Sequence, residues 1–226
     1  MKLKKIWMLI VFGCLLTVIR VPAAPVAVWA QEAQISLDTI MERIESRYAA
    51  SGFQARFDQQ STIKSMDITD MAGGRIYVKR PDKMRWEYDF PERQTVVTDG
   101  STLWIYRPED NQVLVGRAPE YFGGGKGAAF LSDIRTLRDN FTLSLESPDD
   151  GHHKIKLIPK KKTMDLHEIY LSVSKDLYDV AEIITYNAYQ DQTLIRLSHV
   201  VFDKNLSDSM FTFAIPRGAE VLKLEQ

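Results

Sequence analysis

Cysteine is nearly absent from this chain, since Cys14 is the single cysteine among 226 residues. A disulfide needs two thiols, so none can form within the chain. Cys14 also lies in an apolar stretch that we interpret below as part of a leader, so we expect no thiol chemistry in the rest of the chain. The rest of the chain must therefore be stabilised by burial of apolar side chains.

A hydrophobic run long enough to cross a membrane is also missing from the start of the chain. The apolar stretch covers residues 6–19 and is closed by Arg20, whereas a spanning helix needs about 20 residues. Three lysines precede the stretch, and a region of small residues follows it up to Ala30. This pattern is typical of a secretory signal peptide, with a membrane anchor as the alternative. We predict a cleaved signal peptide over residues 1–30 and a single exported domain over residues 31–226.

The chain has no excess of positive charge that would indicate nucleic acid as a partner. It contains 29 Lys and Arg against 30 Asp and Glu. Removal of residues 1–30 would leave 25 basic and 30 acidic side chains, a net charge of −5. Such a mildly acidic surface has little attraction for nucleic acid or for anionic lipid headgroups.

Motifs for catalysis and for cofactor binding are missing as well. The glycine-rich segment 122–127 contains Lys126 but no Ser or Thr directly after it, so it is not a phosphate-binding P-loop. The sequence has no Gly-x-Ser-x-Gly elbow for an acyl-transfer serine. Its 4 histidines lack the spacing of a metal site. We therefore expect no enzymatic activity, no cofactor and no metal ion.

The pattern that is present begins with one amphipathic helix. Ser36 is a suitable N-cap, and apolar residues then recur at steps of three and four residues. Gly52 lies where such a helix would end. We predict a core helix without a chemical role. Its apolar positions are Leu37, Ile40, Met41, Ile44 and Tyr48.

From Phe53 onward the apolar period changes to two residues. The clearest alternation places Met84, Trp86 and Tyr88 on one face of a strand. Asp99-Gly100 predicts a tight hairpin, because both residues tolerate positive φ. We expect about ten or eleven strands in an antiparallel sheet with one apolar face, curled into a barrel or a partly closed barrel. The later strands are expected over 141–146, 153–158, 166–174, 180–188 and 193–202.

One segment interrupts the run of strands. After the glycine-rich tether, Phe130, Leu131, Ile134 and Leu137 fall at helical spacing. We predict one amphipathic helix whose apolar face packs against the sheet. The sequence leaves open whether this helix is a fixed plug or a movable lid.

The segment from Gly73 to Gln112 resembles a known family. It contains GRIYVKRPDKMRWEY over residues 74–88, and Asp99-Gly100 and a Leu-Trp-Ile-Tyr strand over residues 103–106 follow. Weaker agreement extends to the opening helix, to the helix at 127–141 and to the segment 211–218. In these features the chain resembles the periplasmic outer-membrane lipoprotein carrier family, LolA.

The resemblance implies a fold and a set of site residues. The fold would be mainly β with helices (α+β), an unclosed antiparallel half-barrel of about eleven strands with a helical lid over an apolar cavity. Arg80 matches the arginine that is thought to bond lid backbone groups and hold the empty form shut. The residues expected to line the acyl-chain cavity are Met84, Trp86, Tyr88, Leu103 and Ile105, and those expected in the lid are Phe130, Leu131, Ile134 and Leu137.

The resemblance also implies partners and a location. The protein would be a monomeric periplasmic chaperone for acylated lipoproteins. It would receive them from an inner-membrane ABC-type lipoprotein release complex and transfer them to an outer-membrane acceptor lipoprotein. One alternative is a regulatory module that senses lipids or lipoproteins on the same half-barrel. A lipid hydrolase is a further alternative, which the missing nucleophile motifs disfavour.

Overall fold

The computed structural model describes residues 35–49, 52–122, 131, 134–147, 151–203 and 205–224. The predicted signal peptide, Phe130 and the glycines of the tether lie outside these residues. No helix in the described ranges combines the length and the apolar character needed to cross a membrane.

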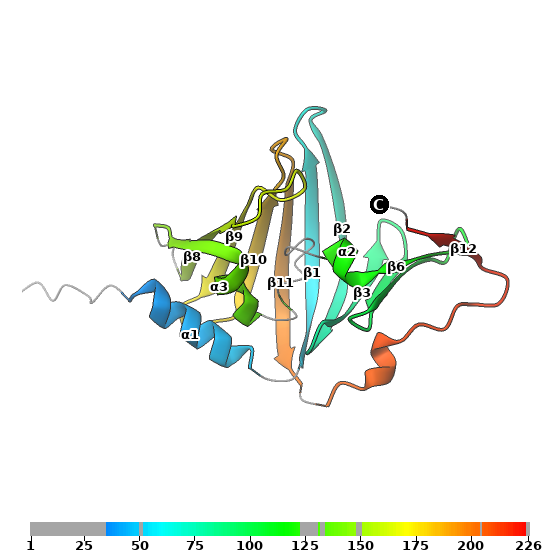
Figure 1. The fold of residues 1–226 in the computed structure, drawn as a ribbon, viewed down its shortest axis with the longest axis horizontal. Coiled ribbons are helices and arrows are strands. Elements are labelled where there is room, and N and C mark those ends of the chain that lie inside the picture. The colour runs from blue at the N-terminus through cyan, green and yellow to red at the C-terminus, as the bar shows by residue number, and fades with distance from the viewer. Residues whose placement is uncertain are drawn as a thin grey trace, which may run out of the picture. The chain divides into compact units, whose positions relative to one another are not determined.

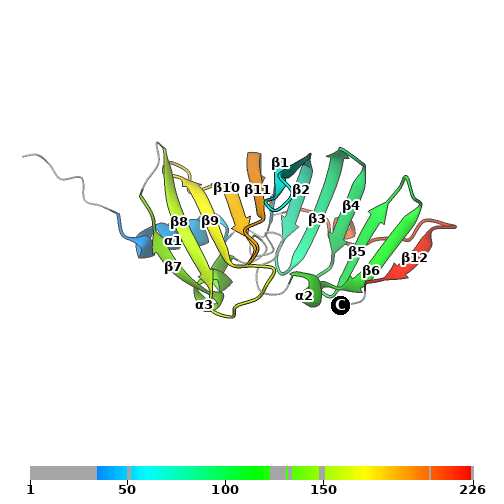
Figure 2. The same ribbon diagram turned by 90° about the horizontal axis from the view of Figure 1, so that it is seen from above.

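One open sheet contains most of the described chain (Figures 1 and 2). Its strands are β1 Gly52–Ile63, β2 Ile68–Lys79, β3 Lys83–Phe90, β4 Gln94–Thr98, β5 Thr102–Arg107, β6 Gln112–Arg117, β7 Phe141–Leu145, β8 His152–Pro159, β9 Glu168–Ser174, β10 Val180–Tyr186, β11 Gln192–Phe202 and β12 Glu220–Lys223. They lie in the order β12-β6-β5-β4-β3-β2-β1-β11-β10-β9-β8-β7. Only the β12–β6 pair is parallel among these strands. The open, mainly β architecture confirms the expectation, and β12 is a strand that the sequence pattern did not indicate.

Local chemistry explains the hairpin between β4 and β5. Gly100 has a φ of +96°, a left-handed conformation that glycine adopts without a steric penalty. The Asp99 carboxylate accepts hydrogen bonds from the backbone N–H groups of Ser101 and Thr102, both at 2.8 Å. The predicted Asp-Gly turn therefore fixes this pair of strands.

Two glycines allow β2 and β3 to pack closely. A Cβ atom on Gly74 would lie 1.8 Å from the carbonyl oxygen of Glu87, and one on Gly73 would lie 2.5 Å from the ring of Phe90. The pairing of β2 with β3 also shifts between Gly73 and Gly74, which marks a bulge. Gly73 and Gly74 are therefore required because the backbone of β2 comes too close to β3 for a side chain at either position.

The opening helix, α1, spans Leu37–Arg47. The Ser36 hydroxyl accepts a hydrogen bond from the Thr39 N–H, as expected of an N-cap. Ile40, Met41 and Ile44 are fully buried against the sheet. The helix also carries Arg47, whose guanidinium pairs with Asp179 at 2.7 Å.

The remaining helices are short. They are α2 Ala118–Phe122, the 3₁₀ turns η2 Ile134–Thr136 and η3 Asp208–Phe211, and α3 Leu137–Asn140. The amphipathic helix expected over 127–141 is represented in the described residues by η2 followed directly by the single turn α3. The prediction of helical structure there is therefore correct in type, although the described part is broken into two short turns.

Most of the buried apolar side chains fall into two clusters. The large cluster joins α1, η2 and α3 to the inward faces of β1–β3 and β7–β11. The small cluster contains Leu103, Ile105 and Ala118. Val96 on β4 packs against both clusters and so connects them.

Candidate functional site

The inward face of β3 carries three of the residues expected in the cavity. Met84 and Trp86 are 2% and 4% exposed, and they pair across the strands with Val78 and Ile76 of β2. Tyr88 is half-buried, and its hydroxyl lies 3.3 Å from the side-chain carbonyl of Gln59. The alternation in the sequence correctly predicted that these side chains share one face.

An aromatic group lies at the centre of this face. The Phe57 ring on β1 packs edge-on against Trp86 at 4.8 Å and against Tyr88 at 5.0 Å between ring centroids. Burial raises the pKa of Tyr88 to about 12, so its hydroxyl stays neutral at physiological pH. The surface formed by these rings is therefore apolar and uncharged.

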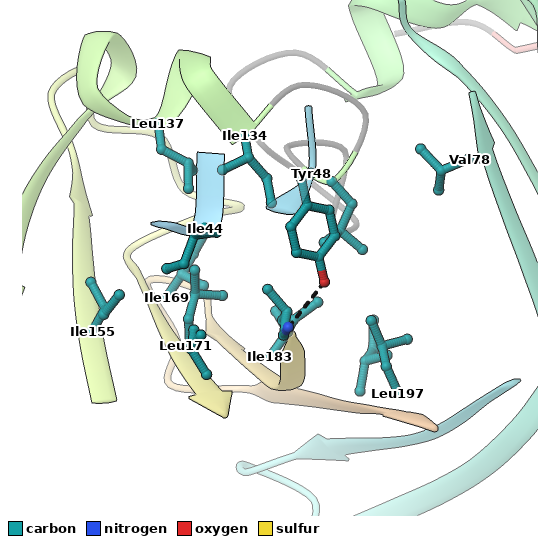
Figure 3. Close-up of a cluster of buried hydrophobic side chains, with 14 of the residues drawn as sticks. Ile44, Tyr48, Val78, Ile134, Leu137, Ile155, Ile169, Leu171, Ile183 and Leu197 are labelled. Carbon is teal, nitrogen blue, oxygen red and sulfur yellow. Dashed lines mark hydrogen bonds between the residues drawn. The ribbon is translucent and has the colours of Figure 1, made fainter. Parts of the chain in front are cut away.

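Three of the four predicted lid residues lie in the described part of the chain, and all three are buried. Leu131, Ile134 and Leu137 are at most 2% exposed and belong to the same cluster as Met84 and Trp86. Figure 3 shows Ile134 and Leu137 next to Ile44 of α1 and Tyr48, the residue that follows the helix. We call the described part of this segment, residues 131 and 134–140, the cover. The cover and α1 bury apolar surface together.

Arg138 connects the cover to α1 through two carboxylates. Its guanidinium donates to the Asp38 carboxylate at 2.7 Å and to the Glu45 carboxylate at 3.0 Å. Hydrogen bonds to Asp38 and to Glu45 raise the pKa of Arg138. The ammonium group of Lys160 donates to the Arg138 carbonyl at 2.9 Å, which adds a contact to the far end of β8. Sequence reasoning did not identify this ionic contact, because it joins residues about a hundred positions apart.

Arg80 lies at the other end of α1. Its guanidinium donates a hydrogen bond to the carbonyl of Tyr48, the residue that caps the C-terminus of the helix. A cation at this position also interacts favourably with the negative end of the helix dipole. The Tyr48 hydroxyl accepts a hydrogen bond from the Val180 N–H at 2.9 Å, and burial raises the pKa of this tyrosine. Arg80 therefore holds the end of α1 that enters the core next to the cover.

Leu103 and Ile105 on β5 lie in the small cluster, apart from the other residues expected to line the cavity. They are buried at 0% and 6% exposure, but they pack with Ala118 of α2 in the small cluster rather than with Trp86. The predicted lining residues thus fall into two adjacent groups that meet at Val96 on β4.

Several apolar residues of the site were not singled out from the sequence. Phe57 on β1 lies between the two aromatic residues of β3, and the strands β8–β11 supply much of the inward face. Their period of two was visible, but it did not show which strands would meet the cover. These additional residues are Ile155, Leu157, Ile169, Leu171, Ile183 and Leu197.

The described residues contain no group of three histidine, cysteine, aspartate or glutamate side chains that could hold a metal ion. His153 is buried beside the Tyr178 ring, at 5.9 Å between centroids. Burial, and then the nearby charges of Lys175 and Arg43, lower its pKa. The described inward face of β3 therefore offers apolar side chains rather than a set of metal ligands.

We compared the chain with family models, with curated proteins and with solved structures. The family model described as outer membrane lipoprotein carrier protein LolA matches residues 49–214. An outer-membrane lipoprotein carrier protein of Neisseria gonorrhoeae is 30% identical over 76% of this chain and 81% of its own length. The carrier protein of Alkalilimnicola ehrlichii is 27% identical over 76% of this chain and 78% of its own. The crystal structure of an uncharacterized conserved protein from Thermus thermophilus shares the fold, with a TM-score of 0.54 at 15% identity, over 83% of this chain and 98% of that one.

Proposed function

Because the chain belongs to the outer membrane lipoprotein carrier protein family LolA, we propose that it is a periplasmic chaperone that binds the acyl chains of lipoproteins. The observation that carries this proposal is the arrangement of the large cluster. Met84 and Trp86 on the sheet belong to the same buried apolar cluster as Ile134 and Leu137 of the cover. Displacement of the cover would expose an apolar face that acyl chains can occupy.

The energetics suit a carrier that both binds and releases. Each CH₂ group removed from water contributes about 0.8 kcal/mol. Part of this gain is offset, because loading must first separate the cover from the sheet and expose Leu131, Ile134 and Leu137, which are buried in the unloaded protein. The affinity for cargo is therefore reduced by the cost of opening, which favours reversible transfer over permanent binding.

We further propose the direction of transfer. The protein would receive lipoproteins from an ABC-type release complex in the inner membrane and pass them to an acceptor lipoprotein at the outer membrane. It would act by binding rather than by catalysis, since no nucleophile, base or metal is needed to hold an acyl chain. A regulatory module on the same fold would bind the ligand without passing it on. A measurement of transfer to an acceptor therefore distinguishes a carrier from a regulatory module.

The test is binding of a fluorescent fatty acid to delipidated protein. The expected result is saturable binding and a change in tryptophan emission that disappears in Trp86→Phe. The Trp104→Phe variant is the matched control, because Trp104 pairs with Val97 and Val115 outside the large cluster. Absence of saturable binding in detergent-free protein would contradict the proposal. A donor-to-acceptor assay with an acylated lipoprotein then tests the transfer step.

A further inference from the structure

The outer end of the β1–β2 hairpin has a free backbone edge. β2 pairs with β1 along its whole length from Ile68 to Lys79, but its pairing with β3 begins only at Gly73. Residues 68–72 therefore have a strand partner on one side only among the described residues. On the other side of the hairpin, β11 pairs with β1 as far as Thr62. Figure 1 shows the hairpin rising beyond β3.

This end of the hairpin also exposes large apolar side chains. Met66 is 66% exposed, Met71 is 50% exposed and Ile68 is 46% exposed, and Ile63 at the end of β1 is 39% exposed. Side chains alternate between the two faces of a strand, so Ile68 and Met71 border the free edge on opposite faces. An exposed edge with apolar residues is a template for another strand unless the protein protects it.

Acidic side chains surround the free edge. Asp67 and Asp70 lie on the hairpin, and Asp89 and Glu92 lie at the adjoining end of β3 and in its turn. All four are exposed, and none forms a salt bridge in the described part of the chain. The segments 63–72 and 89–93 also contain the basic residues Lys64 and Arg93, so together the two segments carry a net charge of −2.

We propose that residues 68–72 of β2 bind an extended segment of a partner protein, which adds a strand beside β2 and carries both basic and apolar side chains on each of its two faces. The free N–H and C=O groups of the edge would supply the hydrogen bonds. Ile68 and Met71 would contact the apolar side chains of the segment, and the carboxylates of Asp67 and Asp70 would attract its basic ones.

The same features argue against two other occupants. A second copy of this chain, paired edge to edge about a twofold axis at the middle of the free segment, would place Asp70 opposite its own copy. Like charges directly opposite across a strand pair are destabilising. A membrane surface with anionic headgroups would be repelled by the four carboxylates. The inference does not depend on the acyl-binding role, because the free edge lies outside the large cluster.

The first test uses a short synthetic peptide that repeats two valines followed by two lysines, which places both residue types on each face of the added strand. We expect it to bind with hydrogen-exchange protection confined to residues 68–72, and to bind more weakly as salt screens the charges. The double variant Asp67→Lys/Asp70→Lys should bind about tenfold more weakly, or about 1.4 kcal/mol. The matched control is Glu109→Lys/Asp110→Lys in the β5–β6 turn, where both side chains are exposed, and its binding should equal that of the unchanged protein.

The second test examines the backbone directly. The same peptide with alternate N-methylated amides cannot complete a ladder, so we expect its binding to be lost. Equal binding of the two peptides, or no binding of either, would overturn the proposal. It would also be overturned by a dimer that dissociates in Met71→Ser, or by binding to anionic vesicles that is lost in Met66→Ser.

Discussion

Met84 and Leu103 illustrate what alternation along a strand can predict about a single residue. Both were expected to face inward, and both are buried, at 2% and 0% exposure. Met84 joins the large cluster, whereas Leu103 packs beside Ala118 in the small one. The period of two fixes the face of a side chain, but its neighbours depend on how far the strands curve, which the sequence does not encode locally.

Met84→Glu should weaken both folding and acyl binding. The carboxylate would be buried among apolar side chains without a partner, which costs on the order of 2 kcal/mol or more. Urea unfolding measures the stability, and the fluorescent fatty acid measures the binding. Lowering the pH should recover part of the stability, because the buried acid would become neutral. Met84→Leu conserves volume and should cost less than about 1.5 kcal/mol; an equal effect of the two substitutions would refute the charge argument.

Arg80→Leu should separate binding from transfer. The substitution removes the donor to the Tyr48 carbonyl and with it a restraint on the end of α1. We expect the variant to take up acylated cargo but to pass it poorly to an acceptor, because the unloaded form is no longer favoured. Arg80→Lys keeps the charge near the helix terminus and should retain part of the transfer rate. Unchanged transfer by Arg80→Leu would exclude a gating role.

At the level of elements, the strands could be predicted far better than the cover. The expected strand at 153–158 and the observed β8 at His152–Pro159 differ by one residue at each end. By contrast, α3 is a single turn at Leu137–Asn140, and its one apolar side chain, Leu137, is held by burial in the large cluster rather than by helix length. β12 escaped prediction because all its side chains are exposed, which leaves no apolar alternation.

Arg138→Gln should loosen the cover. The substitution removes the ionic contacts with Asp38 and Glu45. The Arg138 side chain is 37% exposed, so solvent screens these contacts and their loss should cost no more than about 1 kcal/mol. We expect faster association of the fatty acid, measured by stopped flow. High salt should accelerate association with the unchanged protein and have little further effect on Arg138→Gln. An identical salt response in both proteins would show that this contact does not restrain the cover.

His153 should make the junction between β8 and α1 sensitive to acid. Its pKa is lowered from 6.5 by burial and by the charges of Lys175 and Arg43. The imidazole therefore takes up a proton more readily in the unfolded chain than in the folded chain. The free energy of unfolding should fall as the pH drops below about 6.5. Urea unfolding between about pH 7.5 and pH 5.5 measures this loss. His153→Gln should reduce the slope, whereas His199→Gln, at an exposed position on β11, should leave it unchanged.

At the level of the whole described domain, the sheet is covered unevenly. The half formed by β7–β11 and β1 packs against α1 and the cover, whereas the β4–β6 half contributes the small cluster beside α2 and the separately buried Val97 and Val113. The backbone ladder is continuous across both halves. A change in the cover therefore need not alter the pairing of the strands. The sheet can act as a rigid wall against which α1, η2 and α3 move.

Hydrogen exchange can test this division of the molecule. Loading with fatty acid should reduce the protection of amides in η2 and α3, because the ligand replaces Ile134 and Leu137 against the sheet. The amides of β1, β9 and β10 should keep their protection, since both neighbours of each strand remain paired. Exchange followed by mass spectrometry, with Arg138→Gln as the variant whose cover is already loosened, measures both regions at once. Loss of protection spread evenly over the sheet would mean that the strands themselves separate to admit the ligand, and the cover would then not be the element that opens.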